Sequence, residues 1–290
     1  MTTIRSLLFV PGDSPRKFAS ALRSEADALI IDLEDAVAPA QKSQARVDTV
    51  AMLQSEEAAA SGKVLFVRVN ALDTGLTLAD LAAVMPAAPF GVVLPKCRHG
   101  DDVHTVSLYL DAFEAASGLA GGHTKILAIA TETAGSLFGL GSYAPAHPRL
   151  WGLMWGGEDL AASLGATANQ ANGRWTDPYR MARSLCLAGA AAAGVEAVDT
   201  VAVDIRNLEA VEQQAREARR DGFSAKAVIH PSHVEPVNQA FTPTADEQAW
   251  ARRIVEAFAS QPDAGVVQLE GKMIDKPHLR AAHRILGIRP

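Results

Sequence analysis

Short apolar runs alternate with longer amphipathic stretches along most of this chain of 290 residues. The apolar runs have the length and the flanking Gly residues of strands buried on both faces. They predict β-strands at residues 5–10, 27–33, 64–69, 90–95, 126–131, 150–155, 198–203 and 225–230. The stretches between them predict helices at 15–25, 40–54, 77–85, 101–117, 177–193, 207–221 and 233–240, whereas the Gly-rich piece 134–144 has no clear pattern.

Eight strand–helix units in succession are the repeat of a (β/α)8 TIM barrel. The strands are expected to run parallel because each connection is long enough to hold a helix. Residues 1–242 are therefore interpreted as one α/β barrel and as the catalytic domain.

The alternation ends near Pro243, where a different pattern begins. A helix is expected at 244–259, then a loop at 261–265, a short apolar segment at 266–269 and a last helix at 277–286. Residues 243–290 lie outside a complete barrel. We expect them to form a C-terminal helical extension that is either a lid or an arm contributing to a neighbouring subunit's site.

Composition and charge restrict the range of functions. With 48% hydrophobic residues the chain can bury a large core, and its net charge of −6 argues against nucleic-acid binding. The densest basic group, Arg216, Arg219 and Arg220, alternates with acids and is expected to be a solvated helix face. Cys97 and Cys186 lack metal-type spacing and fit inert thiols in a reducing cytoplasm. No apolar stretch suits a signal peptide or a membrane span, so a cytoplasmic protein without a membrane partner is expected.

Two acidic motifs each follow an apolar run. Glu132 in Thr-Glu-Thr-Ala-Gly follows residues 126–130, and Asp159 in Gly-Gly-Glu-Asp-Leu follows residues 150–155. Each alone is also typical of a helix N-cap or a salt-bridge partner. Because a carboxylate is costly to bury unless it is paired or bound to metal, the two together at adjacent strand ends predict a shared Mg²⁺ at the barrel mouth.

Further polar residues follow other predicted strands. The planar guanidinium of Arg68 can bind a carboxylate or a developing alkoxide, or it can simply neutralise Asp32 or Glu34. The turn at 11–17, which includes Arg16 and Lys17, can hold phosphate, although such turns are common on any surface. His230 precedes a proline and is expected to be a structural hydrogen-bonding group.

Motifs along the whole chain resemble the citrate lyase β-subunit-like (CitE-like) proteins, which include malyl-CoA and citramalyl-CoA lyases. The resemblance rests on Arg-Ser-Leu-Leu-Phe-Val-Pro-Gly (5–12), Asp-Leu-Glu-Asp-Ala-Val (32–37), Val-Arg-Val-Asn (67–70), Leu-Pro-Lys (94–96), Glu-Thr-Ala-Gly (132–135), Gly-Gly-Glu-Asp-Leu (156–160), Lys-Ala-Val-Ile-His-Pro (226–231) and Gly-Lys-Met-Ile-Asp (271–275). Two stretches, 97–100 and 166–176, depart from the family pattern, which leaves the acyl substrate open.

The resemblance implies a role for each matching residue. Glu132 and Asp159 look like the Mg²⁺ ligands, and Arg68 like the residue that binds the keto acid's carboxylate and carbonyl. The backbone at Gly156, Gly157 and Glu158 resembles a second group that binds this carboxylate. Arg16 and Lys17 resemble part of the CoA-binding site. Asp275 matches an acid that enters a neighbouring subunit's site and moves a proton on the acetyl methyl carbon.

The implied activity is Mg²⁺-dependent, reversible cleavage of a 3-hydroxyacyl-CoA into acetyl-CoA and an α-keto acid by a homo-oligomer, which the family suggests is a trimer. Three alternatives stay open: a citryl-carrier lyase (the citrate lyase β subunit), a pyruvate class II aldolase that does not use CoA, and a non-catalytic protein that binds keto acids or CoA.

Overall fold

A computed structural model describes residues 3–288 of the chain. Eight parallel strands close into a barrel in the order β1-β10-β9-β6-β5-β4-β3-β2. Their bounds are β1 Ser6–Pro11, β2 Ala28–Asp32, β3 Val64–Arg68, β4 Gly91–Leu94, β5 Lys125–Ile129, β6 Leu150–Met154, β9 Glu196–Asp199 and β10 Ala225–Val228. The predicted TIM barrel is confirmed.

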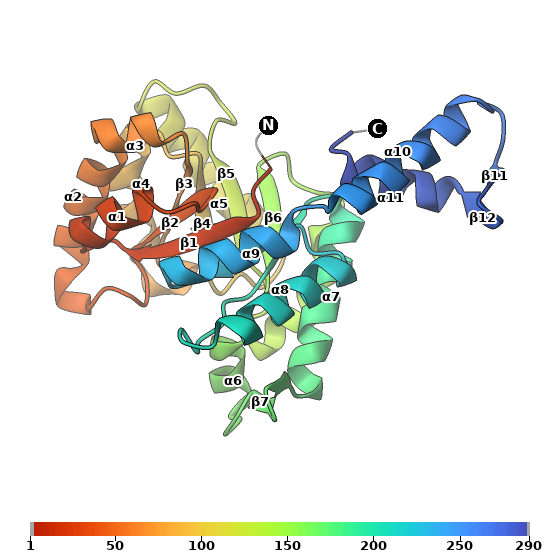
Figure 1. Ribbon diagram of the computed structural model, residues 1–290. Coiled ribbons are helices and arrows are strands. Elements are labelled where there is room, and N and C mark those ends of the chain that lie inside the picture. The colour runs from red at the N-terminus through yellow and green to blue at the C-terminus, as the bar shows by residue number, and fades with distance from the viewer. Residues whose placement is uncertain (1–2, 289–290) are drawn as a thin grey trace. The chain divides into compact units, whose positions relative to one another are not determined.

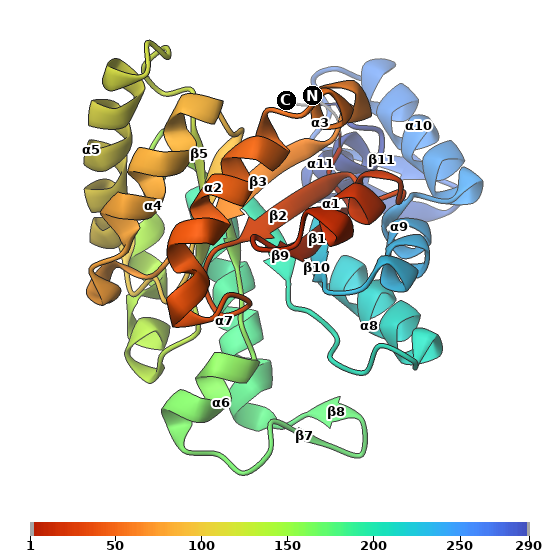
Figure 2. The same ribbon diagram turned by 90° about the vertical axis from the view of Figure 1, so that its left-hand side faces the viewer.

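Helices form a layer outside these strands (Figure 1 and Figure 2). They are α1 Pro15–Leu22, α2 Lys42–Leu53, α3 Glu56–Ser61, α4 Thr77–Val84, α5 Gly100–Ala116, α6 Glu158–Leu164, α7 Asp177–Ala193, α8 Leu208–Asp221 and α9 Val234–Phe241. Short 3-10 helices are η1 Pro39–Gln41, η2 Leu72–Thr74, η3 Met85–Ala87, η4 Ala134–Tyr143 and η5 Pro231–His233. A small antiparallel hairpin, β7 Gln170–Ala171 and β8 Arg174–Trp175, separates α6 from α7.

Seven of the eight predicted strands overlap the observed ones closely, but the strand expected at 198–203 is wrong in its bounds. The observed β9 begins at Glu196 because Gly194 ends α7 in a left-handed conformation (φ 70°) and returns the chain to the barrel at once. It ends at Asp199, and the next carbonyl, that of Thr200, accepts a hydrogen bond from the ammonium of Lys226. Helices α3 and α6 were not predicted, and the unassigned piece 134–144 contains η4.

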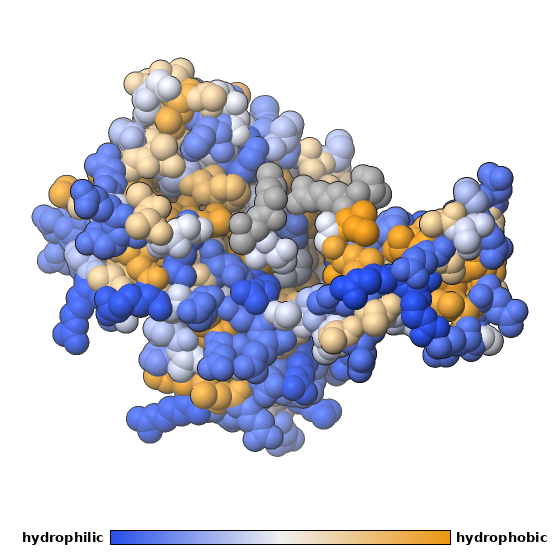
Figure 3. All heavy atoms as spheres, turned by 45° about the horizontal axis from the view of Figure 1, so that its top comes forward, coloured by the Kyte–Doolittle hydropathy of each residue, from blue (hydrophilic) through white to orange (hydrophobic). Residues whose placement is uncertain are grey.

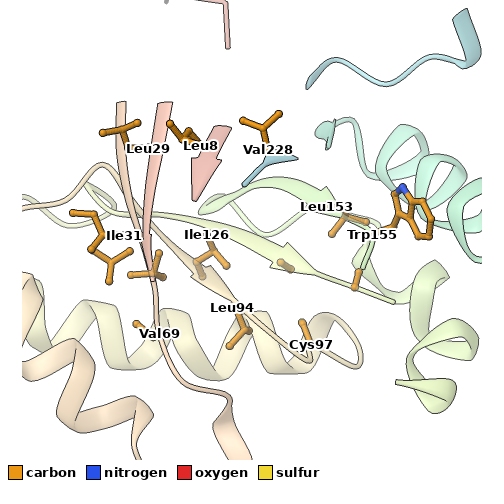
Figure 4. Packing of buried hydrophobic residues seen from close by; sticks show 14 of the residues in the cluster. Leu8, Leu29, Ile31, Val69, Leu94, Cys97, Ile126, Leu153, Trp155 and Val228 are labelled. Carbon is orange, nitrogen blue, oxygen red and sulfur yellow. The ribbon is translucent and has the colours of Figure 1, made fainter. Parts of the chain in front are cut away.

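The core has two layers because side chains on neighbouring strand positions point to opposite faces. Leu7, Phe66 and Leu127 belong to a cluster inside the barrel. Leu8 and Trp155 belong to the larger cluster between strands and helices, which Figure 4 shows from close by.

The chain divides into two compact units, Met1–Phe241 and Thr242–Pro290. The second unit contains α10 Ala245–Ala259, the hairpin strands β11 Val266–Leu269 and β12 Lys272–Asp275, and α11 Lys276–Ile285. Its own small core includes Ile254, Phe258, Val267 and Ile274. Apolar side chains also gather on its surface (Figure 3). Within residues 3–288, no helix has the length and apolar character needed to cross a membrane.

Candidate active site at the barrel mouth

The carboxyl ends of five neighbouring strands bring the predicted polar residues of the barrel together. Parallel strands share one mouth, so residues at their ends converge although they are far apart in sequence. Asp32 ends β2 and lies opposite Arg68, which ends β3. Lys96 follows β4, Glu132 follows β5, and Gly156–Asp159 follow β6.

Glu132 is a buried carboxylate that the chain leaves only partly compensated. Its side chain is 4% exposed, and its Oε2 accepts a hydrogen bond of 2.5 Å from the backbone N–H of Lys96. Burial, with the nearby charges of Asp159 and Glu34, raises the pKa of Glu132 to about 8. Glu132 is therefore suited to bind a cation that would keep it ionised.

Lys96 connects the carboxylates around Glu132. Its ammonium contacts Glu34 and lies 3.3 Å from Oδ1 of Asp159, which is the second residue of α6. Burial works to lower the pKa of Lys96, but the hydrogen bond and charge of Glu34 and the charge of Glu132 raise it above its usual value. The backbone of Lys96 has φ 52°, an uncommon conformation for a residue with a side chain. In this conformation the backbone amide of Lys96 contacts Glu132 and its ammonium contacts Glu34.

Arg68 forms ion pairs with both acids that were considered as its neutralising partners. Its Nε and Nη2 each donate to Asp32 over 2.7 Å, and Nη1 lies 2.9 Å from Oε2 of Glu34. The guanidinium also lies 5.0 Å from the ring of Phe9. Because a guanidinium carries five N–H groups, these contacts hold it in place and still leave N–H groups for a substrate oxygen.

The charges of this cluster do not balance. Asp32, Glu34, Asp35, Glu132 and Asp159 carry five negative charges when ionised, whereas Arg68 and Lys96 carry two positive charges. No group of three or more His, Cys, Asp or Glu side chains suited to a metal occurs in the described part of the chain. A donor set of two carboxylates, Glu132 and Asp159, in a cluster with an excess of negative charge fits a divalent cation that keeps positions for water or substrate.

In the segment after β6, Gly156 approaches Glu132 closely and Gly157 approaches Trp175. A Cβ on Gly156 would lie 2.7 Å from Cγ of Glu132, and one on Gly157 would lie 3.0 Å from the ring of Trp175. The N–H of Gly156 donates to Oγ1 of Thr131 over 2.9 Å. Glu158 is exposed and accepts a hydrogen bond of 2.9 Å from Asn169, so its carboxylate belongs to the rim.

A buried charge network behind this segment was missed in the sequence. Nε1 of Trp155 donates to Asp199 over 2.6 Å, and Asp199 also pairs with Lys226 at 2.7 Å and with Arg183 at 3.1 Å. Burial opposes ionisation of Asp199, but the charges of Lys226 and Arg183 hold its pKa below its ordinary value. Lys226 inside an apolar run was the available signal, because a buried ammonium needs a buried anion.

The remaining predicted residues lie in different settings. Arg16 and Lys17 are exposed in the first turn of α1, and no ion pair is recorded for either within residues 3–288. His230 caps η5 through Ser232, which confirms a structural role. Cys97 and Cys186 are buried free thiols, and burial raises the pKa of Cys97 to about 12.

Asp275 belongs to the second unit, where it caps the N-terminus of α11. Its Oδ1 lies 2.5 Å from Nδ1 of His278, and this contact lowers the pKa of Asp275. Its predicted entry into a neighbouring subunit's site stays a prediction.

Comparison with known proteins identifies the family to which the chain belongs. Residues 5–231 match the HpcH/HpaI aldolase/citrate lyase family, and residues 188–288 match a C–C bond lyase family of the TIM-barrel fold. The citrate lyase subunit beta-like protein of Mycobacterium tuberculosis (strain H37Rv) is 35% identical over 280 residues, covering 96% of this chain and 93% of its own. The mitochondrial citramalyl-CoA lyase of Rattus norvegicus is 31% identical, with 98% and 85% covered.

Solved structures agree with these relatives. The crystal structure of CitE from M. tuberculosis in complex with magnesium, acetoacetate and coenzyme A has a TM-score of 0.77 and 34% identity, and covers 99% of this chain and 98% of its own. The chain therefore belongs to the HpcH/HpaI aldolase/citrate lyase family, and it is a carbon–carbon lyase of the citrate lyase and aldolase kind.

Proposed function

We propose that the protein is a Mg²⁺-dependent lyase that reversibly cleaves a 3-hydroxyacyl-CoA, of the citramalyl-CoA or malyl-CoA type, into acetyl-CoA and an α-keto acid. The observation that carries the proposal is the pair Glu132 and Asp159, only partly compensated by Lys96, beside Arg68 at the barrel mouth. The CitE structure with magnesium, acetoacetate and coenzyme A and the citramalyl-CoA lyase relative support the same chemistry.

Glu132 and Asp159 would hold the metal ion, which when bound would act as a Lewis acid on the keto acid's oxygens. Arg68, fixed by Asp32 and Glu34, donates its free N–H groups to the keto acid's carboxylate and to the oxygen that gains negative charge. The backbone of Gly156–Glu158 binds the other end of that carboxylate. Together these groups stabilise an alkoxide without having to reorganise.

The proton step is assigned to Asp275 of the partner subunit in a homo-oligomer, for which we propose a trimer. In condensation this carboxylate takes a proton from the acetyl methyl group, and the electron pair of the broken C–H bond forms the enolate that attacks the keto carbon. In cleavage the substrate's hydroxyl group loses its proton to solvent, the C–C bond breaks with its electron pair forming the enolate, and protonated Asp275 returns a proton to the methyl carbon. Arg16 and Lys17, which are exposed and without recorded ion pairs in the described chain, are proposed to bind phosphate groups of CoA.

The test is release of acetyl-CoA from citramalyl-CoA and malyl-CoA, followed by mass spectrometry with and without EDTA. We expect turnover of at least one substrate, its loss on chelation and its recovery with Mg²⁺. Equal turnover after complete metal removal would contradict the metal's role, and absence of turnover with every acyl-CoA of a broad panel would contradict the reaction.

A citryl-carrier lyase is the second candidate. The citrate lyase subunit beta of Escherichia coli K12 is 35% identical to this chain and covers 98% of it. Citrate attached to an acyl carrier protein is the discriminating substrate: cleavage of this thioester at a much higher kcat/KM than that of citramalyl-CoA would favour the carrier-dependent enzyme.

A further inference from the structure

Among the described residues, the hydrogen bonds to the Asp275 carboxylate reach one of its oxygens, Oδ1. Oδ1 lies 2.5 Å from Nδ1 of His278 and 3.4 Å from the backbone N–H of the same residue. Within residues 3–288, no hydrogen bond is recorded to Oδ2. The side chain of Asp275 is 33% exposed, so a molecule that approaches the hairpin can reach the carboxylate.

The contact with His278 requires a proton. Nδ1 of His278 also lies 3.2 Å from the backbone N–H of Asp275, where it would act as an acceptor. An imidazole nitrogen carries either a hydrogen or a lone pair in the ring plane, never both. Facing the ionised Oδ1, a bare lone pair would be repelled. The pair therefore holds one proton between Oδ1 and Nδ1, carried by the imidazole while Asp275 is ionised.

Within residues 3–288, the ion pair found for this carboxylate is the one with His278, and the nearby cations make other contacts. On α10, Arg253 lies 5.2 Å from the ring of Trp250 and also pairs with Glu270 of the hairpin turn. On β12, Lys272 lies 5.4 Å from the same ring.

Two further neighbours of Asp275 lie on α11 and β11. On α11, Lys276 lies 4.8 Å from the ring of Phe258. Opposite Asp275 on β11 is Val266, an apolar residue that is 52% exposed. Within residues 3–288, His278 is thus the residue that is hydrogen-bonded to the side chain of Asp275.

We propose that His278 is a positioning residue for Asp275: it holds Oδ1 and keeps the carboxylate ionised, so that Oδ2 alone exchanges the substrate proton. The inference rests on the proposed function, in which Asp275 acts at the acetyl methyl carbon. A C–H bond breaks, an O–H bond forms at Oδ2, and the electron pair stays on the enolate. The hydrogen bond from Nδ1 to Oδ1 is kept throughout, and the reverse direction returns the proton from Oδ2 to carbon.

The experiment compares variants of His278 in the full-length protein. His278→Ala removes the ring, and His278→Phe keeps a ring of similar shape but removes its nitrogen atoms. His278→Asn retains an amide that can donate to Oδ1, and His283→Ala is a matched control on the same helix. The measurements are made in the condensing direction, where Asp275 starts ionised: kcat, the KM for the keto acid, the pH profile of kcat, and deuterium exchange into the methyl group of acetyl-CoA in D2O.

We expect His278→Ala and His278→Phe to lose about tenfold in kcat and in the rate of methyl exchange, because the carboxylate of Asp275, the proton acceptor, is no longer held in position. The KM for the keto acid should stay unchanged, and the acidic limb of kcat should move to higher pH because the pKa of Asp275 is no longer lowered. His278→Asn should keep most of the rate, free imidazole should partly restore His278→Ala, and His283→Ala should behave as wild type.

Wild-type kcat, pH profile and exchange in His278→Phe, together with an inactive Asp275→Asn, would overturn this inference and leave the proposed function intact. Full activity in Asp275→Asn would instead contradict the role of Asp275 in the proposed function. His278→Ala could also lose activity while His278→Phe stays active and the pH profile stays unchanged. That result would show that His278 only caps the helix and has no part in the proton step, and it would also overturn the inference.

Discussion

Two carboxylates of this protein have opposite environments. Glu132 at the barrel mouth is 4% exposed and surrounded by other acids, which raises its pKa to about 8. Asp275 in the C-terminal unit is partly exposed and hydrogen-bonded to His278, which lowers its pKa. The difference separates two tasks. A buried carboxylate with too few cations suits metal binding, whereas an accessible carboxylate with one free oxygen suits proton transfer.

A change at Asp275 tests most directly whether the two carboxylates have separate tasks. Asp275→Asn is expected to lower kcat by about 10²–10⁴, the usual contribution of a positioned general base. Affinity for Mg²⁺ and for the keto acid, measured by calorimetry, should be nearly unchanged because Asp275 is assigned only the proton. Loss of keto-acid binding in this variant would show that the two tasks are not separate.

The reciprocal change is Glu132→Gln at the barrel mouth. We expect kcat to fall by about 10²–10³, as when one group that stabilises transition-state charge is lost. Unlike Asp275→Asn, this variant should also lose the rise in melting temperature that Mg²⁺ causes in the wild type. The matched control is Glu158→Gln on the same rim, where the carboxylate is exposed and paired with Asn169. A Mg²⁺-induced shift of wild-type size in Glu132→Gln would remove Glu132 from the ligand set.

The pH dependence of metal binding sharpens the contrast further. Because the pKa of Glu132 is raised to about 8, the carboxyl binds a proton below that pH, and the proton must leave before the metal is bound. The association constant for Mg²⁺ is therefore expected to rise by up to about tenfold per pH unit from pH 6 to 8 and then to level off. Titration calorimetry in buffers of different ionisation enthalpy measures this proton release. A flat profile between pH 6 and 8 would contradict the raised pKa.

The smallest expected effect concerns the network behind the metal ligands. Trp155→Phe removes the hydrogen bond to Asp199 and should cost about 2 kcal/mol in the free energy of unfolding, because the acceptor is charged and buried. Trp151→Phe is the matched control, since Trp151 packs against Phe66 at 5.4 Å and has no recorded bond to a charged group in the described residues. Equal denaturation midpoints for the two variants would show that this hydrogen bond contributes nothing to stability.

The barrel was predictable because its strands are buried on both faces and read as continuous apolar runs. The motifs that follow those runs also identified Arg68, Glu132 and Asp159 as neighbours at one mouth. The boundaries of β9 and the existence of α3 and α6 were not predictable in the same way. Gly194 sets the start of β9 through its left-handed conformation, and α6 is a short helix that follows the glycines near Glu132.

The sequence by itself determined the fold class and which acids follow which strands, because hydrophobic periodicity and strand order are local properties of the chain. Only the tertiary structure decided how the charges pair: that Arg68 is held by both Asp32 and Glu34, that Lys96 contacts Glu132 through its amide, and that Asp199 lies behind Trp155. The physical reason is that the energy of a buried charge depends on every charge and dipole within a few ångströms. Those neighbours come from strands widely separated along the chain.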